Sequence, residues 1–193
     1  MLRSLYDWTL ALAAHRHARW GLAVVSFIES SVFPIPPDVV LIPMVLADRQ
    51  RAWRLAAICT VASVLGGVAG YAIGYFLFDA FGRPLLDFYG YAENFAHFQD
   101  RYNDYGAWWV FGAGLTPFPY KVITIASGVT GLNVATFMLA SVLARAARFF
   151  LVAALLWKFG EPIRAFIERW LGPLTVLFFV LLFGGFLVAR YAL

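Results

Sequence analysis

Five ionisable side chains interrupt segments that are otherwise apolar: Glu29, Asp38, Lys121, Arg145 and Arg148. Carboxylates take up and release protons, and guanidinium and ammonium groups bind phosphate. Each such group costs about 2.5–3.5 kcal/mol at the centre of a bilayer on insertion scales, so a purely structural membrane protein has little reason to keep them. Arg145 and Arg148 are three positions apart and therefore share one face of a helix. We take these five residues as the candidates for binding substrate or protons.

Two interpretations of these charges stay open. In the structural interpretation, the carboxylate of Glu29 or Asp38 forms a buried ion pair with Lys121 or Arg145. In the functional one, the cations bind an anionic substrate while a carboxylate exchanges a proton. The two are compatible if an arriving anion displaces the carboxylate from its cation, because a carboxylate that loses its counter-ion binds a proton more readily.

Composition places the chain among the integral membrane proteins. Of its 193 residues, 62% are apolar and only 13% are charged, about half the charged share of a soluble domain. A soluble fold of this size could not keep that much apolar surface from water. A disordered chain is excluded as well, because 18% of the residues are aromatic.

The charge and the residue types exclude several function classes. A net charge of +4 is too small and too scattered for a nucleic-acid-binding protein. One cysteine and three scattered histidines offer no metal-ligand spacing, so we expect no metal and no other cofactor. The sequence has no Ser-His-Asp set and no glycine-rich phosphate loop, so we do not expect an enzyme.

The pattern of apolar runs predicts an all-α integral membrane fold with a single domain. Full spans are expected at 55–78, 134–157 and 170–189, because each run is long enough to cross a bilayer. The predicted parts are an interfacial helix at 1–19, a first repeat at 20–78, an extracytoplasmic amphipathic loop at 79–106, a second repeat at 107–157, and a linker with a C-terminal transmembrane helix at 158–193.

Prolines break the first apolar segment of each repeat, and the two breaks superimpose at an offset of 83 positions. An unbroken helix cannot continue through such prolines, so each segment forms either a kinked span or a re-entrant hairpin, and the charges of the flanking loops favour the hairpin. The offset places Asp38 on Lys121, and we therefore expect these two opposite charges to meet where the hairpins approach each other. The predicted hairpin tips are formed by Pro34, Pro36, Pro37, Thr116, Pro117 and Pro119.

Loop charges decide how the hairpins lie. The segments at 1–19 and 48–54 are both basic, whereas the loop at 79–106 is acidic. The positive-inside rule is obeyed if both basic segments are cytoplasmic, which makes 20–47 re-entrant. The second hairpin then enters from the opposite face. The two repeats are thus predicted to be inverted, an arrangement typical of secondary transporters.

Small and hydroxyl-bearing side chains near these breaks indicate helix packing and candidate anion contacts less specifically than the charged residues do. A stripe of small residues recurs every four positions in the span at 55–78, and it predicts close packing against another helix. Hydroxyl groups beside the breaks could donate hydrogen bonds to an anion, although such groups usually bond to their own backbone. The stripe is Ala62, Gly66, Gly70 and Gly74, and the hydroxyls are those of Ser30, Ser31, Thr116, Thr124 and Ser127.

The two proline-centred motifs resemble those of the DedA family, also called the VTT or SNARE-associated family. The segment ESSVFPIPPD at 29–38 is similar to the first family motif, in which a second acidic residue follows a Glu nine positions on. The segment GLTPFPYK at 114–121 resembles the second motif, most closely that of the YqaA-like subgroup. One departure is Gly114, where many members have an arginine. The resemblance covers about residues 20–157.

This resemblance implies a membrane protein that moves lipids between leaflets. Bacterial members are linked to recycling of undecaprenyl phosphate and phospholipids with dependence on the proton gradient, and eukaryotic relatives are scramblases. We therefore expect a flippase or scramblase for a lipid phosphate in the bacterial inner membrane, with a cytoplasmic N-terminus. Its partners would be lipids and protons, and whether it forms a homo-oligomer is left open. The alternatives are a non-transporting scaffold or homeostasis factor and a transporter of small ions or solutes.

Overall fold

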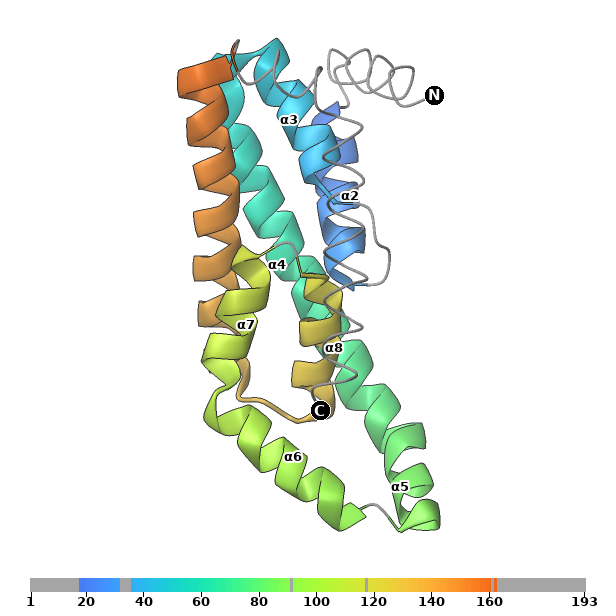
Figure 1. The fold of residues 1–193 in the computed structure, drawn as a ribbon. Helices are drawn as coiled ribbons and strands as arrows, with labels where there is room; N and C mark the ends of the chain where they lie inside the picture. Colours follow the sequence, from blue (N-terminus) through green and yellow to red (C-terminus); the bar gives the residue numbers. More distant parts are fainter. Residues whose placement is uncertain (1–17, 32–35, 91, 117, 161, 163–193) are drawn as a thin grey trace.

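The computed structural model describes residues 18–31, 36–90, 92–116, 118–160 and 162, and within them helices account for almost every residue and no strand is present (Figure 1). Most of the predicted interfacial helix and the predicted C-terminal transmembrane helix lie outside these residues. Two of the predicted tip prolines, Pro34 and Pro117, also lie outside them. The all-α prediction is confirmed for the described part.

Two helices in the described part are long and apolar enough to cross a membrane. They run over Arg49–Gly82 and Val134–Gly160, with 34 and 27 residues, and about 20 residues suffice to span a bilayer. The first comprises a 3-10 turn at Arg49–Arg51, helix α4 at Ala52–Leu77 and a π-helical turn at Phe78–Gly82. Both helices expose large apolar side chains, a surface that suits contact with lipid. Among the most exposed are Val61, Leu65, Leu139 and Leu143.

The two proline-broken segments each form a pair of short helices. The first contains α2 (Ala18–Ser31) and α3 (Asp38–Ala47), and the second contains α7 (Gly106–Leu115) and α8 (Tyr120–Val129). At about 1.5 Å per residue, none of the four is long enough to cross a bilayer alone. Pro37 and Pro119 stand immediately before α3 and α8, where a proline is tolerated because its missing N–H would have no helical partner.

The two helix pairs lie along opposite halves of α4. Figure 1 shows α2 and α3 beside the half of α4 nearest its start, and α7 and α8 beside the other half, with the end of α7 and the start of α8 near the middle of the bundle. Both α2 and α8 pack closely on α4 and also contact each other. The start of α2, the start of α4 and the end of the helix Val134–Gly160 share one end of the bundle.

Two short helices form the opposite end. Helix α5 (Arg83–Tyr89) ends at Gly90, whose φ of 71° is the left-handed conformation that closes many helices. Helix α6 (Ala92–Asp104) then returns to the bundle, where the side-chain amides of Gln99 and Asn103 donate to the backbone carbonyl of Thr130, at the end of α8. The predicted amphipathic loop at 79–106 is thus helical.

Two buried apolar clusters are separated by a polar layer. One cluster joins α2, α3, the start of α4 and the end of the helix Val134–Gly160. The other joins α6, α7, α8 and the start of that same helix. Along the helix Val134–Gly160, Ala140 belongs to the second cluster and Phe149 to the first. Arg145 and Arg148 lie between these positions, and Arg145 is only 1% exposed.

The predicted stripe of small residues is a packing surface. Gly66 faces the backbone carbonyl of Phe27 on α2, and Gly74 faces that of Ile125 on α8. A Cβ atom at either glycine would overlap a backbone atom of the neighbouring helix. The glycines therefore allow both broken segments to approach α4 closely.

Replacing Gly66 by alanine is expected to destabilise the fold by about 1–3 kcal/mol, because the backbone of α2 would have to move away from α4. Gly112→Ala is the matched control, since a Cβ atom there meets no atom within 4 Å. That change should be neutral, or stabilise α7 by up to about 1 kcal/mol. Thermal unfolding of the two variants in detergent measures the difference, and equal melting temperatures would refute the close packing.

Candidate functional site

The centre of the polar layer is an ion pair between Arg145 and Glu29. Nη2 of Arg145 donates to Oε2 of Glu29 at 2.7 Å, and the two side chains are 2% and 13% exposed. Arg145 lies near the middle of the helix Val134–Gly160, and Glu29 lies in the last turn of α2 before the chain breaks. The pair therefore joins a membrane-spanning helix to the end of a broken segment. This is one of the structural pairings that the sequence predicts.

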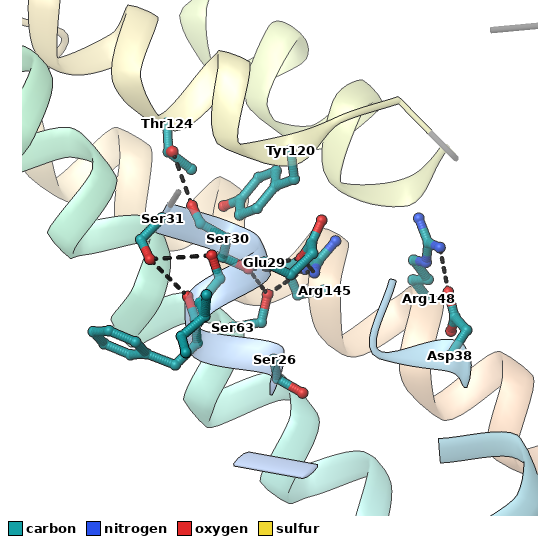
Figure 2. A network of polar contacts seen from close by, with 12 residues as sticks. Ser26, Glu29, Ser30, Ser31, Asp38, Ser63, Tyr120, Thr124, Arg145 and Arg148 are labelled. Carbon is teal, nitrogen blue, oxygen red and sulfur yellow. Dashed lines mark hydrogen bonds and ion pairs between the residues drawn. The ribbon is translucent and has the colours of Figure 1, made fainter. Parts of the chain in front are cut away.

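Two serines complete the hydrogen bonding of this pair (Figure 2). Nε of Arg145 donates to Oγ of Ser63 at 2.5 Å, and the hydroxyls of Ser63 and Ser30 are 2.6 Å apart. The Ser30 hydroxyl lies 3.0 Å from Oε2 of Glu29. Helices α2, α4 and Val134–Gly160 thus contribute to one connected network. Such bonding is required, because a buried charge without it would carry a large desolvation cost.

Aromatic rings enclose the Arg145 guanidinium. Its Cζ atom lies 4.6 Å from the ring centre of Tyr120 and 4.8 Å from that of Phe149, within the range of cation–π attraction. The Tyr120 hydroxyl donates to Oγ of Ser141 at 2.5 Å, so this ring is held in place from the helix that carries the arginine. The Arg145 guanidinium is therefore held by Glu29, by two serine hydroxyls and by two aromatic rings.

A second ion pair joins the two breaks. Nη2 of Arg148 donates to Oδ2 of Asp38 at 2.5 Å, and its Nη1 donates to the backbone carbonyl of Thr116 at 2.7 Å. Asp38 begins α3, and Thr116 follows the last residue of α7. A carboxylate at a helix N-terminus and a cation at a helix C-terminus both interact favourably with the helix dipoles. One guanidinium therefore holds together the ends of both broken segments.

The two pairs differ in accessibility. The side chains of Arg148 and Asp38 are 19% and 20% exposed, whereas that of Arg145 is 2% exposed. In addition, Oδ1 of Asp38 is buried and has no hydrogen-bond partner among the described residues. The Arg148 pair is therefore the more accessible of the two, and one oxygen of its carboxylate makes no hydrogen bond within the described part of the chain.

The prediction that Asp38 pairs with Lys121 is wrong. Asp38 pairs instead with Arg148, whose guanidinium has enough donors to reach both this carboxylate and the Thr116 carbonyl. Lys121 lies in the first turn of α8, and its backbone carbonyl accepts a hydrogen bond from Thr124. Four of the five predicted site residues thus form the two ion pairs, and the fifth, Lys121, lies in α8. Pro36, Pro37, Thr116 and Pro119 flank the breaks as predicted.

The hydroxyl groups divide between local and long-range bonds. The hydroxyls of Ser31 and Thr116 donate to carbonyls of their own helices, which is the usual behaviour. In contrast, Thr124 of α8 donates to the backbone carbonyl of Ser30 and so connects the two broken segments directly. The fifth predicted hydroxyl, that of Ser127, lies 3.0 Å from that of Tyr102 on α6.

Three site residues were not predicted from the sequence: Ser63, Tyr120 and Phe149. Ser63 is a small residue beside the glycine stripe, and nothing in its spacing indicates that it faces Arg145. Phe149 is adjacent to Arg148 in sequence but lies four positions after Arg145, and such a spacing brings an aromatic ring over a guanidinium on one helix face. That spacing is a signal that could have identified it.

A family model for the VTT domain matches residues 35–158, which include α3, the second break and both candidate membrane spans up to residue 158. The chain belongs to the VTT domain, or DedA, family. The predicted family membership is therefore confirmed, and with it membrane association. Asp38, Lys121, Arg145 and Arg148 lie within the matched region of this VTT-domain protein, and Glu29 lies before it.

Two relatives match most of this VTT-domain protein. A protein of Haemophilus influenzae is 40% identical over 169 residues, which are 86% of this chain and 88% of the relative. A protein of Histophilus somni is 39% identical over the same length and with the same coverage. Both carry names that describe them as uncharacterised. No solved structure matches the chain.

Proposed function

We propose that this VTT-domain protein is a flippase or scramblase that moves a lipid phosphate, either undecaprenyl phosphate or a phospholipid, between the leaflets of the bacterial inner membrane. The observation that carries the proposal is the partly accessible Arg148–Asp38 pair, which holds the two breaks together in the middle of an apolar bundle. A guanidinium binds two phosphate oxygens at once, and a position midway along the bundle is where an alternating-access site belongs.

In this mechanism, an arriving phosphate takes the place of the Asp38 carboxylate on Arg148. Asp38 then has a charge without a counter-ion, and protonation removes that charge. Departure of the phosphate reverses both steps, because the deprotonated carboxylate again competes for the guanidinium. The exchange would couple lipid movement to the proton gradient. It would also release the Thr116 carbonyl from Arg148 and free α3 and α7 to move relative to each other.

The Arg145–Glu29 pair has a different part in this proposal. Its guanidinium is held by Glu29, Ser63 and the two rings, so a phosphate would have to displace several groups to reach it. We assign it the role of positioning α2 against the helix that carries Arg148.

The proposal includes the arrangement of the chain in the membrane. The pairs α2–α3 and α7–α8 are re-entrant hairpins that enter from opposite faces, and the two repeats are inverted. Support comes from their places along opposite halves of α4 and from exposed aromatic residues at both ends of the bundle, as expected at membrane interfaces. The basic end, with Arg19, Arg51 and Arg54, faces the cytoplasm, as does the N-terminus.

Cysteine labelling tests this arrangement. Arg51→Cys and His97→Cys, each in a Cys59→Ala background, place single thiols at exposed positions on opposite ends of the bundle. An impermeant maleimide added to intact cells should label residue 97 and spare residue 51, and disruption of the membrane should make both reactive. Labelling of both positions, or of neither, in intact cells would refute the re-entrant arrangement.

Transport itself is tested in vesicles. The purified protein is reconstituted with a fluorescent phospholipid in both leaflets, and an impermeant reductant quenches the outer leaflet. Protein-free vesicles should lose about half of the signal, whereas a scramblase brings the inner lipid to the quencher and lowers the signal further. A scaffold predicts no difference from protein-free vesicles. The assay is repeated with fluorescent undecaprenyl phosphate. If the folded protein gives the same signal as protein-free vesicles with both lipids, the proposed function is refuted.

A further inference from the structure

The basic end of the bundle contains a pocket that is separate from the two ion pairs. Its volume is about 430 Å³, within the usual range of ligand sites. Arg19 comes from the start of α2, and the other lining residues come from the 3-10 turn and the first two turns of α4. The pocket is lined by Arg19, Arg51, Arg54, Leu55, Ala57 and Ile58.

The charges around this pocket favour an anion. Arg51 forms an exposed ion pair with Asp48 at 2.8 Å. Arg19 and Arg54 form no ion pair within the described part of the chain. Both are exposed, so their guanidinium groups keep their donors available to a ligand. Three arginines and one aspartate therefore leave a net positive charge at an open pocket.

The neighbouring surface favours a lipid as the source of that anion. Arg54, Ile58, Val61 and Leu65 follow one face of α4, with spacings of four, three and four residues. Val61 and Leu65 are 60% and 55% exposed, so an apolar track leads from the basic pocket along the bundle. An acyl chain could lie on this track while its phosphate binds the arginines.

Tryptophans place the pocket at the level of the lipid headgroups. Trp20 follows Arg19 directly and is 72% exposed, and Trp53 precedes Arg54 directly and is 43% exposed. Tryptophan is enriched where the polar headgroups meet the hydrocarbon. Basic pockets between helices at this level bind anionic lipid headgroups.

We propose that this pocket binds the phosphate headgroup of an anionic phospholipid, with an acyl chain along Val61 and Leu65. Arg19 and Arg54 bind the phosphate oxygens, and Arg51 contributes charge from its pair with Asp48. The site goes beyond the proposed transport function. It holds a lipid at the surface of the protein and does not need the Arg148–Asp38 pair to exchange partners.

Native mass spectrometry of the full chain in mild detergent tests this site with two probe lipids. Phosphatidylglycerol is anionic and phosphatidylcholine is zwitterionic. The wild-type protein should retain phosphatidylglycerol at least tenfold better. Arg19→Gln combined with Arg54→Gln should reduce that preference at least fivefold, and both positions are exposed, so the variant should fold. No preference in the wild type, or an unchanged preference in this variant, would overturn the proposal.

Two controls make the assignment specific. Arg49 lies at the same end of the bundle but against Gly160, and it does not line the pocket, so Arg49→Gln should retain the preference. An equal loss in Arg49→Gln would mean that the lipid responds to overall charge rather than to this site. Soluble glycerol phosphate should compete at least tenfold more weakly than the lipid, because it lacks the chain that contacts Val61 and Leu65. Equal competition would assign the pocket to free phosphate and overturn the lipid assignment.

Discussion

Replacing Arg145 by methionine is expected to lower the free energy of unfolding by about 3–5 kcal/mol, the usual cost of removing one partner from a buried ion pair. Glu29 would be left with a charge in an apolar bundle, and the hydroxyls of Ser63 and Ser30 would lose their cation. The two aromatic rings that enclose the guanidinium would also lose a favourable contact. Chemical denaturation in detergent, followed by circular dichroism, measures the loss.

A matched pair of variants separates the charge from the packing. Arg145→Met combined with Glu29→Gln removes both charges and should recover much of the stability lost by Arg145→Met alone, because no uncompensated charge remains. Arg148→Met should cost less than Arg145→Met, since Asp38 is partly accessible to water. Equal losses in all three variants would show that the ion pair does not determine the stability of this layer.

Arg148→Lys is expected to leave the protein folded and to reduce lipid-phosphate transport at least tenfold. Lysine keeps the positive charge, so the Asp38 charge remains compensated. Its single ammonium group, however, cannot hold Asp38 and the Thr116 carbonyl in the geometry of the guanidinium, nor bind two phosphate oxygens as a fork. The loss corresponds to about one charge-assisted hydrogen bond, worth roughly 1.5–3 kcal/mol. Initial rates in the vesicle assay, with melting temperature as the check on folding, provide the measurement.

Asp38→Asn is the companion variant, because asparagine keeps the shape but neither competes for Arg148 as an anion nor takes up a proton. It should bind a lipid phosphate at least as tightly as the wild type, yet its transport should no longer respond to a proton gradient. Glu29→Gln should leave that response in place, since the Arg145–Glu29 pair has a positioning role. Normal transport in Arg148→Lys would assign the second pair to structure alone and refute its proposed role in binding the lipid phosphate.

Much of the fold could be predicted because its signals are local or repeated along the chain. The long apolar runs predict the two described spans to within a few residues at most ends. The prolines predict the breaks, and Gly131, with a φ of 63°, follows the end of α8 in a turn. Asn133 then begins the next helix, and its side chain accepts hydrogen bonds from the N–H groups of Ala135 and Thr136.

The partners of the site residues were harder to predict, because they depend on helix rotation. Arg148 contacts both Asp38 and Thr116, beside the two breaks, yet the repeat pairs Asp38 with the residue at the equivalent position, Lys121. The actual partner, Arg148, comes from a helix that follows the second break and has Leu65 at the equivalent position of the first repeat. Symmetry could not predict a contact that one repeat alone provides. Ser63 faces Arg145 for a similar reason: the rotation of α4 is set by its glycine contacts with α2 and α8.

The central claim is that the protein recognises a phosphate as it moves a lipid between leaflets. The most direct measurement compares, in the same reconstituted vesicles, the leaflet exchange of a fluorescent lipid with a phosphate headgroup and of a matched glucosyldiacylglycerol, which has a polar headgroup without phosphate, each relative to protein-free vesicles. The account predicts that the wild-type protein accelerates only the phosphate lipid, and that Arg148→Lys removes most of that acceleration. Equal acceleration of both lipids, unchanged in Arg148→Lys, would contradict it.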